Sequence, residues 1–158
     1  MTFREAQLSD IKQLYEVRLS VKENVLPDPG FITEREYEKY LTHFGKGWLC
    51  EIDGQVAGFA IIGLSQRNVW ALFVRPEHEG KGIGRKLHDI MLEWYFNQTN
   101  ETVWLGTGPN TRAEIFYRAA GWKETAKRPN GELKFELSSE DWKLHSKNKT
   151  ENANNIEG

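Results

Sequence analysis

The sequence contains only one cysteine, Cys50, among its 158 residues, so no disulfide bond can form within the chain. It has no apolar run near the ~20 residues that a membrane-spanning helix needs, and its first residues show no signal-peptide pattern. It also lacks an excess of basic residues, because the formal net charge is −2 and the pI is about 6.1. We therefore expect a cytoplasmic protein with neither a nucleic-acid nor a membrane partner.

What the sequence does contain is the composition of a globular domain. Hydrophobic residues account for 39% of the chain and charged residues for 28%, which at this length is enough to bury a core. We expect one domain over residues 1–138. Residues 139–158 are polar and rich in Asn and Lys, and we expect this tail to be largely disordered.

The stretch from Asn68 to Trp94 carries the clearest pattern. Residues 69–74 form an apolar run of β-branched and aromatic residues, which predicts a strand that ends before Pro76. Apolar residues then recur with the spacing of one helical face, at Ile83, Leu87, Ile90, Met91 and Trp94. Three glycines lie between strand and helix, at Gly80, Gly82 and Gly84. A glycine-rich turn before a helix presents unpaired N–H groups to an anion, so this stretch predicts a phosphate-binding turn.

Two common phosphate-binding patterns fit this turn poorly. The P-loop requires Lys followed by Ser or Thr after its last glycine, whereas Arg85 and Lys86 follow Gly84. The dinucleotide pattern G-x-G-x-x-G directly follows a strand, whereas here the spacing is G-x-G-x-G and residues 75–79 intervene. A nucleotide-binding βαβ protein therefore remains only an alternative, as does a tight turn that binds no ligand.

Turn and capping signals predict the remaining elements. Asp53-Gly54 is a strong signal for a hairpin turn. Ser9 is a candidate N-cap, and a Thr followed three residues later by Glu marks two further helix starts, at Thr33 and Thr111. We expect strands at 2–6, 48–52, 55–64, 69–74, 102–105, 122–126 and 132–137. We expect helices at 9–24, 33–44 and 112–120 and from 83 onward, with a turn-rich break at 26–30.

The residues around the glycine-rich turn resemble the acyl-CoA-binding motif of the GNAT superfamily of N-acetyltransferases. The matching residues are Phe73-Val74, Pro76-Glu77 and Glu79-Gly80-Lys81-Gly82-Ile83-Gly84. One residue departs from the motif, because Glu79 stands where the family has Gln or Arg. A carboxylate beside a pyrophosphate is electrostatically unfavourable, so we expect the Glu79 side chain to point away and only its backbone to take part.

A second segment resembles the other GNAT signature. It reads Asn110-x-x-Ala113-x-x-Phe116-Tyr117-x-x-x-Gly121-Trp122, and it follows the first motif in the family's order. The resemblance covers about residues 48–137. It implies an α+β fold in α/β/α layers, with a mostly antiparallel mixed sheet of about six or seven strands and about four helices. It also implies that the strands ending at Val74 and Leu105 part at their C-terminal ends, with acyl-CoA in the gap.

The resemblance assigns roles to individual residues. It implies acetyl-CoA as cosubstrate, no metal, and a primary amine of a small molecule or a peptide as acceptor; a homodimer is compatible with it. Backbone groups of Phe73 and Val74 would pair with the pantetheine arm, and Asn110 would hydrogen-bond it. Tyr117 would lie near the thioester sulfur. The pyrophosphate would be held by the N–H groups of the turn, at Gly80, Lys81, Gly82, Ile83, Gly84 and Arg85.

The chemistry of amide formation supports two of these roles. Attack on a thioester needs stabilisation of an oxyanion and a proton for the departing thiolate. The N–H of Val74 can polarise the carbonyl, and the phenol of Tyr117 can serve as the acid, because phenol and thiol pKa values lie within about two units. The alternative for Tyr117 is a core tyrosine beside Phe116. A second function for the whole protein is a CoA-binding sensor that transfers nothing.

Several residues keep two interpretations. The general base is open among Glu23, Glu36, Glu51, His78 and a chain of waters. Arg18, on the inward face of the first helix, either pairs with a carboxylate or reaches a substrate. The cations Lys81 and Arg85 either neutralise phosphate or are simply solvated, and for Arg112 a carboxylate partner is a further alternative. Three strand tryptophans either line the acceptor site or fill the core, namely Trp48, Trp70 and Trp104.

Overall fold

This computed structural model describes residues 1–24 and 33–147 of the chain. The chain divides into two compact units, Met1–Gln98 and Thr99–Gly158. The expectation of one domain over residues 1–138 therefore stays a prediction. The predicted break at 26–30 lies outside the described residues.

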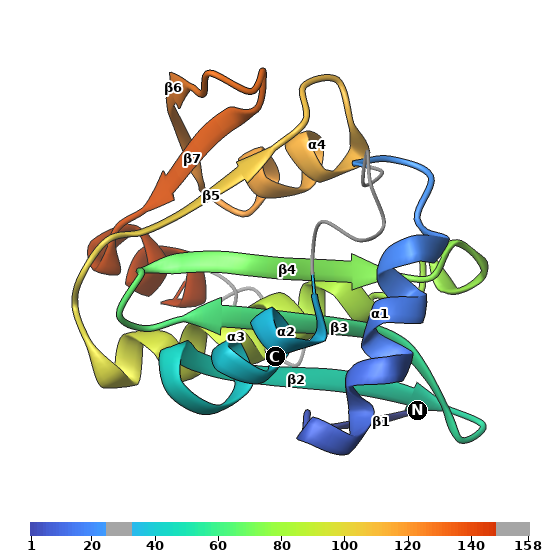
Figure 1. Ribbon diagram of the computed structural model, residues 1–158. Helices are drawn as coiled ribbons and strands as arrows, with labels where there is room; N and C mark the ends of the chain where they lie inside the picture. The colour runs from blue at the N-terminus through green and yellow to red at the C-terminus, as the bar shows by residue number, and fades with distance from the viewer. Residues whose placement is uncertain (25–32, 148–158) are drawn as a thin grey trace, which may run out of the picture. The chain divides into compact units, whose positions relative to one another are not determined.

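The first unit contains an antiparallel meander of four strands, β1 to β4 in spatial order (Figure 1). The strands are β1 (Thr2–Glu5), β2 (Gly45–Ile52), β3 (Gln55–Gly63) and β4 (Asn68–Val74). The predicted hairpin turn joins β2 to β3, with φ of 52° at Asp53 and 77° at Gly54. Two left-handed residues match the twist of a hairpin, which explains the Asp-Gly pair and confirms this prediction.

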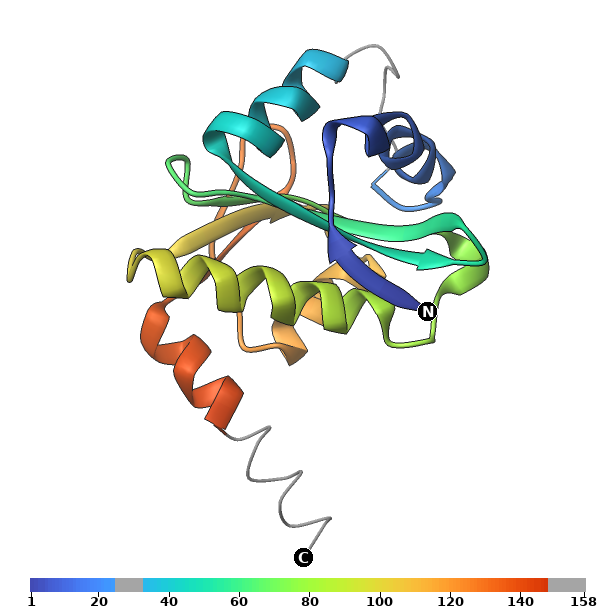
Figure 2. The same ribbon diagram turned by 90° about the horizontal axis from the view of Figure 1, so that it is seen from below.

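Helices cover both faces of this meander. In Figure 2, α1 (Ile11–Ser20) and α2 (Glu34–Lys39) lie on one face and α3 (Ile83–Gln98) on the other. Short helical turns complete the unit, namely η1 (Leu8–Asp10), the π-helical η2 (Tyr40–Phe44) and η3 (Pro76–His78). The side chain of Thr33 accepts a hydrogen bond from the Glu36 N–H at 3.4 Å, which confirms the predicted cap of α2.

The predicted start and end of the first helix were wrong. Gln7, not Ser9, is the N-cap of the first helical turn, and α1 ends at Ser20 rather than near residue 24. The cause is the carboxylate of Asp10, which accepts the Gln7 N–H at 2.8 Å and two hydrogen bonds from Arg4 at 2.9 Å each. These bonds hold residues 8–10 in a 3₁₀ turn. The local sequence alone does not show that Ser9 is not the N-cap.

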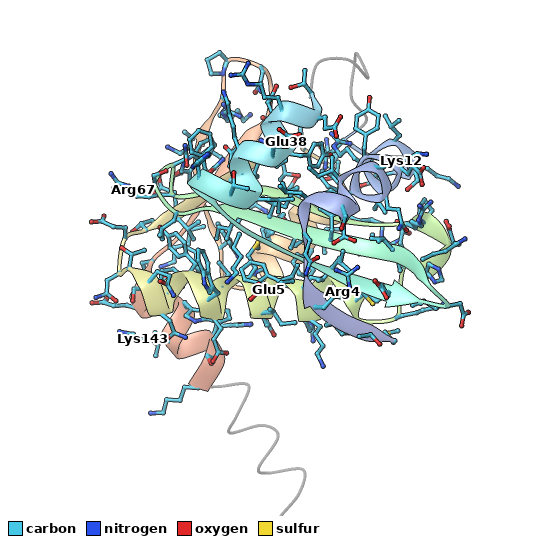
Figure 3. The ribbon with its side chains drawn as sticks, turned by 60° about the horizontal axis from the view of Figure 1, so that its bottom comes forward. Arg4, Glu5, Lys12, Glu38, Arg67 and Lys143 are labelled. Carbon is cyan, nitrogen blue, oxygen red and sulfur yellow. The ribbon has the colours of Figure 1, made fainter. Side chains whose placement is uncertain are left out.

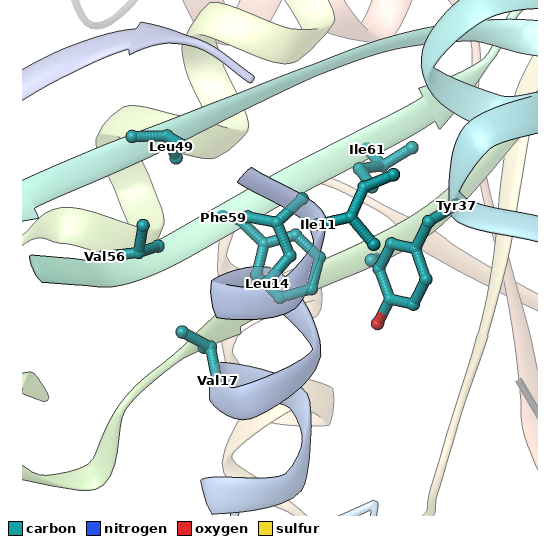
Figure 4. Close-up of a cluster of buried hydrophobic side chains, with 9 residues drawn as sticks. Ile11, Leu14, Val17, Tyr37, Leu49, Val56, Phe59 and Ile61 are labelled. Atoms are coloured by element: carbon teal, nitrogen blue, oxygen red, sulfur yellow. The ribbon is translucent and has the colours of Figure 1, made fainter. Parts of the chain in front are cut away.

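The core of the first unit lies between α1, α2 and the sheet (Figure 4). Ile11, Leu14 and Val17 recur on one face of α1 and are buried, as the helical spacing of the first two predicts. They pack with residues of α2, β2 and β3, namely Tyr37, Leu49, Val56, Phe59 and Ile61. Each such side chain contributes roughly 1.5–3 kcal/mol when fully buried. Lys12 of α1 and Glu38 of α2 are exposed on the outside of this unit, as Figure 3 shows.

The buried face of α3 is wider than the apolar spacing predicted. Ile83, Leu87 and Met91 are buried as expected, but Ile90 and Trp94 are only half-buried. Three other residues are buried in their place, namely His88, Leu92 and Tyr95. Because a helix that lies flat on a sheet buries a broad stripe, neighbours of the predicted positions also turn inward.

The second unit contains β5 (Val103–Thr107), α4 (Arg112–Ala119), β6 (Lys123–Lys127) and β7 (Leu133–Leu137). β7 pairs antiparallel with both β5 and β6. At the end of α4, the N–H of Trp122 donates to the Tyr117 carbonyl at 3.0 Å, and the N–H of Gly121 donates to the Arg118 carbonyl at 3.2 Å. This Schellman motif requires a left-handed residue, and Gly121 has φ of 95°, as predicted for the position after the helix.

The described part of the tail forms a further helix, and the expected disorder of the tail as a whole stays a prediction. Residues 139–147 are helical, and Trp142 is buried. Ser138 caps this helix, because its hydroxyl accepts the Asp141 N–H at 3.1 Å, and Lys123 forms an ion pair with Asp141 at 3.2 Å. Burial of one tryptophan supplies the apolar contact that the polar composition concealed. Residues 148–158 lie outside the described residues.

The predicted fold class, α+β with mostly antiparallel strands, is confirmed. The described residues contain seven strands and the helices α1 to α4, besides the helix at 139–147. None of the described helices is long and apolar enough to cross a membrane. The expected parting of two strands concerns β4 and β5, which belong to different units, and it stays a prediction.

The ion pairs of Arg4 make stability depend on pH. Hydrogen bonds from Arg4 lower the pKa of the buried Asp10 carboxyl below its ordinary value, against the opposing effect of burial. A lowered pKa means that the unfolded chain binds the proton more tightly, so this stabilisation exists above about pH 4 and is lost as the pH falls. Asp10→Asn should cost about 1–3 kcal/mol at pH 7 and progressively less towards pH 3, as measured by urea unfolding.

The control is Asp53→Asn. Asp53 is exposed in the hairpin turn, and asparagine tolerates its left-handed backbone. Its difference from the wild type should stay within about 0.5 kcal/mol at every pH. A difference for Asp10→Asn that is unchanged between pH 7 and pH 3 would contradict the proposed linkage.

Candidate functional site

The end of β4 directs one backbone N–H away from the sheet of the first unit. Val74 is opposite Gly58 of β3, and the next residue, Arg75, donates its N–H to the Ala57 carbonyl at 2.8 Å. Since alternate residues of an antiparallel strand point to opposite sides, the N–H and C=O of Val74 point away from β3. The backbone groups of Phe73 point towards β3. Of the predicted pair, Val74 is therefore the residue whose backbone groups β3 does not engage, and the pairing of Phe73 and Val74 with a pantetheine arm stays a prediction.

The glycine-rich turn has the conformation that its sequence indicates. Gly80 and Gly82 both have φ of 80°, and a Cβ at either position would meet nothing within 4 Å. Backbone conformation, rather than space, therefore requires glycine here. The first hydrogen bond of α3 runs from the Lys86 N–H to the Gly82 carbonyl at 3.1 Å. The N–H groups that precede it, at Ile83, Gly84 and Arg85, project from the positive end of the helix.

The backbone N–H of Glu79 is already engaged. It donates to the Pro76 carbonyl at 3.3 Å, as the closing bond of η3. The expectation that the backbone of Glu79 takes part in anion binding stays a prediction. The amides suited to an anion begin at Gly80. The side chain of Glu79 is exposed.

Gly58 determines how closely the turn and the strand end approach each other. A Cβ at this position would lie 2.9 Å from the Phe73 carbonyl oxygen, 3.1 Å from Val74 Cγ2 and 3.3 Å from Ile83 Cγ2. Its absence lets the first residue of α3 pack against the last residue of β4. Sequence reasoning missed this residue, although an isolated glycine inside an apolar strand is a signal of close approach.

The charged residues of the turn have different environments. The Lys81 ammonium donates to Nδ1 of His78 at 2.9 Å. Lys86 Nζ lies 5.0 Å from the centre of the Phe3 ring, whereas Arg85 is exposed at the start of α3. An anion bound at the turn would therefore meet cations from Lys81 and Arg85 as well as helix amides.

The candidates for the general base lie in different environments. Glu51 accepts hydrogen bonds from Arg4 at 2.8 and 2.5 Å, so its carboxylate is committed to an ion pair. The lone pair of His78 Nδ1 faces Lys81. Glu23 is exposed beyond α1, and Glu36 lies in the first turn of α2. The identity of the general base stays open among Glu23, Glu36, Glu51, His78 and a chain of waters.

Asn110 lies in the turn before the helix of the second motif. It has φ of 60°, a conformation that asparagine tolerates, and its N–H donates to the Glu114 carboxylate at 2.8 Å. The Thr111 hydroxyl accepts the Glu114 N–H at 3.2 Å, which confirms the predicted cap of α4. The bond from Asn110 is the main cause that lowers the pKa of Glu114. Glu114 therefore caps α4, and Asn110 lies exposed in the turn before it.

Tyr117 is buried in the second unit. The centroid of its ring lies 5.2 Å from the ring centroid of Phe116, 5.5 Å from that of Trp122 and 6.5 Å from that of Phe135. Burial raises the pKa of the phenol, which therefore stays protonated at neutral pH. A protonated phenol is what an acid requires, although a raised pKa makes it a weaker acid. The ring also packs the core, so the structure is compatible with both interpretations of Tyr117.

Other residues singled out from sequence have mainly packing contacts. Trp48 is buried and meets Trp94 edge to face at 5.6 Å, and Cys50 is buried with its pKa raised by burial, as an inert thiol would be. Trp70 is half-buried and stacks on Tyr40 at 4.4 Å. Trp104 is half-buried among cations of the second unit, at Arg128 and Lys134. Arg18 lies 4.3 Å above the Phe73 ring.

Comparisons with known proteins agree with the two motifs. The family described as Acetyltransferase (GNAT) family matches residues 11–122, and no curated protein matches the chain. Solved structures of similar fold are ribosomal-protein-S18-alanine N-acetyltransferase from Escherichia coli (17% identity, 87% of this chain, 92% of that chain, TM-score 0.70) and a GNAT acetyltransferase from Staphylococcus aureus Mu50 (21%, 87%, 98%, 0.74). A third is the paia N-acetyltransferase from Thermoplasma acidophilum in complex with coenzyme A (14%, 87%, 98%, 0.69). These likenesses show the fold, and the family match over more than half of the chain shows that the protein belongs to the GNAT acetyltransferase family.

Proposed function

We propose that this protein transfers the acetyl group of acetyl-CoA to a primary amine by direct attack within a ternary complex. The observation that carries the proposal is the geometry of the first unit at the end of β4. There the outward N–H of Val74 and the amide-rich start of α3 are joined by the close contact at Gly58. The first can polarise a thioester carbonyl, and the second can hold a pyrophosphate.

The residues of the turn suit a diphosphate in charge as well as in shape. The N–H groups of residues 83–85 would donate to phosphate oxygens at the positive end of α3. Lys81 and Arg85 would add two cations near them, which offsets the exposed carboxylates of Glu77 and Glu79. Acetyl-CoA would supply the activated acetyl group and the thiolate leaving group.

The second unit would supply the proton and a contact to the pantetheine arm. Asn110, exposed before α4, would hydrogen-bond the pantetheine amides. Tyr117 would give its phenolic proton to the departing thiolate. Burial of Tyr117 supports this role in one respect, because the phenol keeps its proton until the thiolate forms. The acceptor is proposed only as a primary amine, of a small molecule or of a peptide.

A CoA-binding sensor without activity is the second candidate. The packing of Tyr117 against Trp122 and Phe135 favours it, because a ring that fills the core of the second unit needs no chemical role. Thiol release from acetyl-CoA, assayed over a panel of small amines and peptides, separates the two. Release with at least one amine supports the transferase, whereas CoA binding without release supports the sensor. Thermal shifts with CoA, NAD and ATP test the remaining nucleotide-binding alternative.

Gly82→Ala should weaken the binding of CoA. Alanine at φ of 80° costs roughly 1–2 kcal/mol, and relief of that strain moves the amides at the start of α3. We expect the dissociation constant for CoA to rise about tenfold or more, as measured by isothermal titration calorimetry.

Gly54→Ala is the matched control for this change. Gly54 also has a positive φ, 77°, and a Cβ there also meets nothing within 4 Å, but it lies in the hairpin between β2 and β3. It should lose similar stability and keep the wild-type affinity for CoA. Equal affinities in wild type and Gly82→Ala would remove the turn from the binding site.

Tyr117→Phe should lower kcat while leaving the fold intact. The ring contacts with Trp122 and Phe135 remain, and only the proton donor is lost. General acid catalysis contributes about 10²–10⁴-fold, so we expect a loss of at least tenfold at saturating acetyl-CoA. Tyr95→Phe, which removes a hydroxyl from a fully buried tyrosine of α3, is the control and should keep its kcat. Unchanged turnover in Tyr117→Phe would leave Tyr117 with its packing role alone.

A further inference from the structure

Arg75 links three elements of the first unit at the end of β4. Its N–H donates to the Ala57 carbonyl at 2.8 Å, and its side-chain Nε donates to the neighbouring Val56 carbonyl at 2.8 Å. Its Nη2 lies 3.8 Å from the Glu16 carboxylate of α1, and its side chain is only 20% exposed. One residue therefore joins β4 to β3 through backbone and side chain, and reaches α1 as well.

The start of β3 needs such support, because its pairing is irregular there. The register between β2 and β3 shifts between Cys50 and Glu51, so that Ala57 has no partner on β2. A bulge of this kind interrupts the ladder and bends the strand. Side chains make up for the interruption on both sides of Val56. Its N–H donates to the Gln13 side chain of α1 at 3.1 Å, and its carbonyl accepts from Arg75.

The end of β4 is equally exposed to fraying. Pro76 follows Arg75 and has no N–H, so the ladder between β3 and β4 ends at the Arg75 amide. That last bond is the one that directs the Val74 N–H away from β3. A strand end held by a single backbone bond would let this N–H tilt, and the Arg75 side chain adds the second attachment.

We propose that Arg75 is a positioning residue of the acetyl transfer, which fixes the direction of the Val74 N–H by attaching the end of β4 to Val56 and Glu16. The inference rests on the proposed function, in which this N–H polarises the thioester. An oxyanion donor acts only when it is held in place before the reaction, and small displacements cost large factors in rate. The side chain of Arg75 is engaged within the first unit, so it acts through Val74 and not as a ligand of the CoA phosphates.

The test compares Arg75→Met, Arg75→Lys and the wild type in the full chain. Methionine keeps the length without the donor, and lysine keeps the charge without the Nε that meets Val56. We expect both variants to lose kcat by about tenfold or more, with the dissociation constant for CoA within about twofold of the wild type. Glu16→Gln, which weakens only the longer contact, should lose less.

A readout independent of turnover is the hydrogen exchange of the residue 75 amide, followed by NMR. Its bond to Ala57 should open more often without the side-chain attachment, so exchange should be about tenfold faster in both variants. Ile11→Val is the control for general destabilisation, because it removes one buried methyl group of α1 and leaves the bonds of Arg75 to Ala57, Val56 and Glu16 in place. It should lower stability and leave kcat and the residue 75 exchange rate unchanged.

The outcomes separate the two proposals. If Arg75→Lys restores kcat, charge rather than attachment matters and the inference fails. If CoA affinity falls in both variants while kcat holds, Arg75 is a phosphate ligand and the inference fails. If the wild type itself acetylates no amine, the proposed function fails. The exchange rate then still decides whether Arg75 holds the strand end.

Discussion

The contact between β4 and α3 at Gly58 is the constraint on which the first unit's site depends. A Cβ at this position would lie only 3.1 Å from Val74 Cγ2 and 3.3 Å from Ile83 Cγ2, so glycine leaves room for both side chains. Two backbone features of different origin lie on either side of this contact. One is the outward N–H at the end of a strand, and the other is the set of unpaired N–H groups at the start of a helix. Each feature depends on local backbone structure, whereas their relative position depends on side-chain packing.

In the candidate site of the first unit, backbone groups with uncommon conformations lie beside well-packed helices and strands. Gly80 and Gly82 adopt left-handed conformations, and the amides of residues 83–85 precede the helical hydrogen bonds. Such groups are tolerated because the remainder of the unit fixes them. On one face of the sheet the buried residues of α1 and α2 pack on Phe59, and on the other face α3 buries one side, from Ile83 at its start to Tyr95 near its end. The turn itself therefore needs few contacts of its own.

In the second unit, one helix carries both structural and proposed chemical roles. The carbonyl of Tyr117 accepts the bond that closes α4, and its ring packs against Trp122 and Phe135. The same burial keeps the phenol protonated. A tyrosine that anchors a core and donates a proton has little freedom to move, which suits a group that must meet a sulfur in one orientation. The proposal that Tyr117 donates a proton rests on the resemblance of its motif to the GNAT family. The packing of its ring does not by itself point to a chemical role.

Local signals in the sequence determined most of the elements and the two motifs. The Asp53-Gly54 hairpin, the Thr33 and Thr111 caps and Gly121 after α4 each depend on a few consecutive residues, so they could be predicted without the fold. The glycine-rich turn belongs to this group as well. These features follow from backbone conformations that few residue types adopt, and the chain carries that information locally.

Tertiary structure alone decided the features that depend on distant residues. The direction of the Val74 N–H follows from its register with β3, and the 3₁₀ turn before α1 follows from Arg4, which is itself held by Glu51 of β2. Trp142 is buried within the helix at residues 139–147, which gives this polar stretch an apolar contact. Each of these outcomes needs a partner far along the chain, and a side-chain pattern read one segment at a time contains no information about which partner will be adjacent.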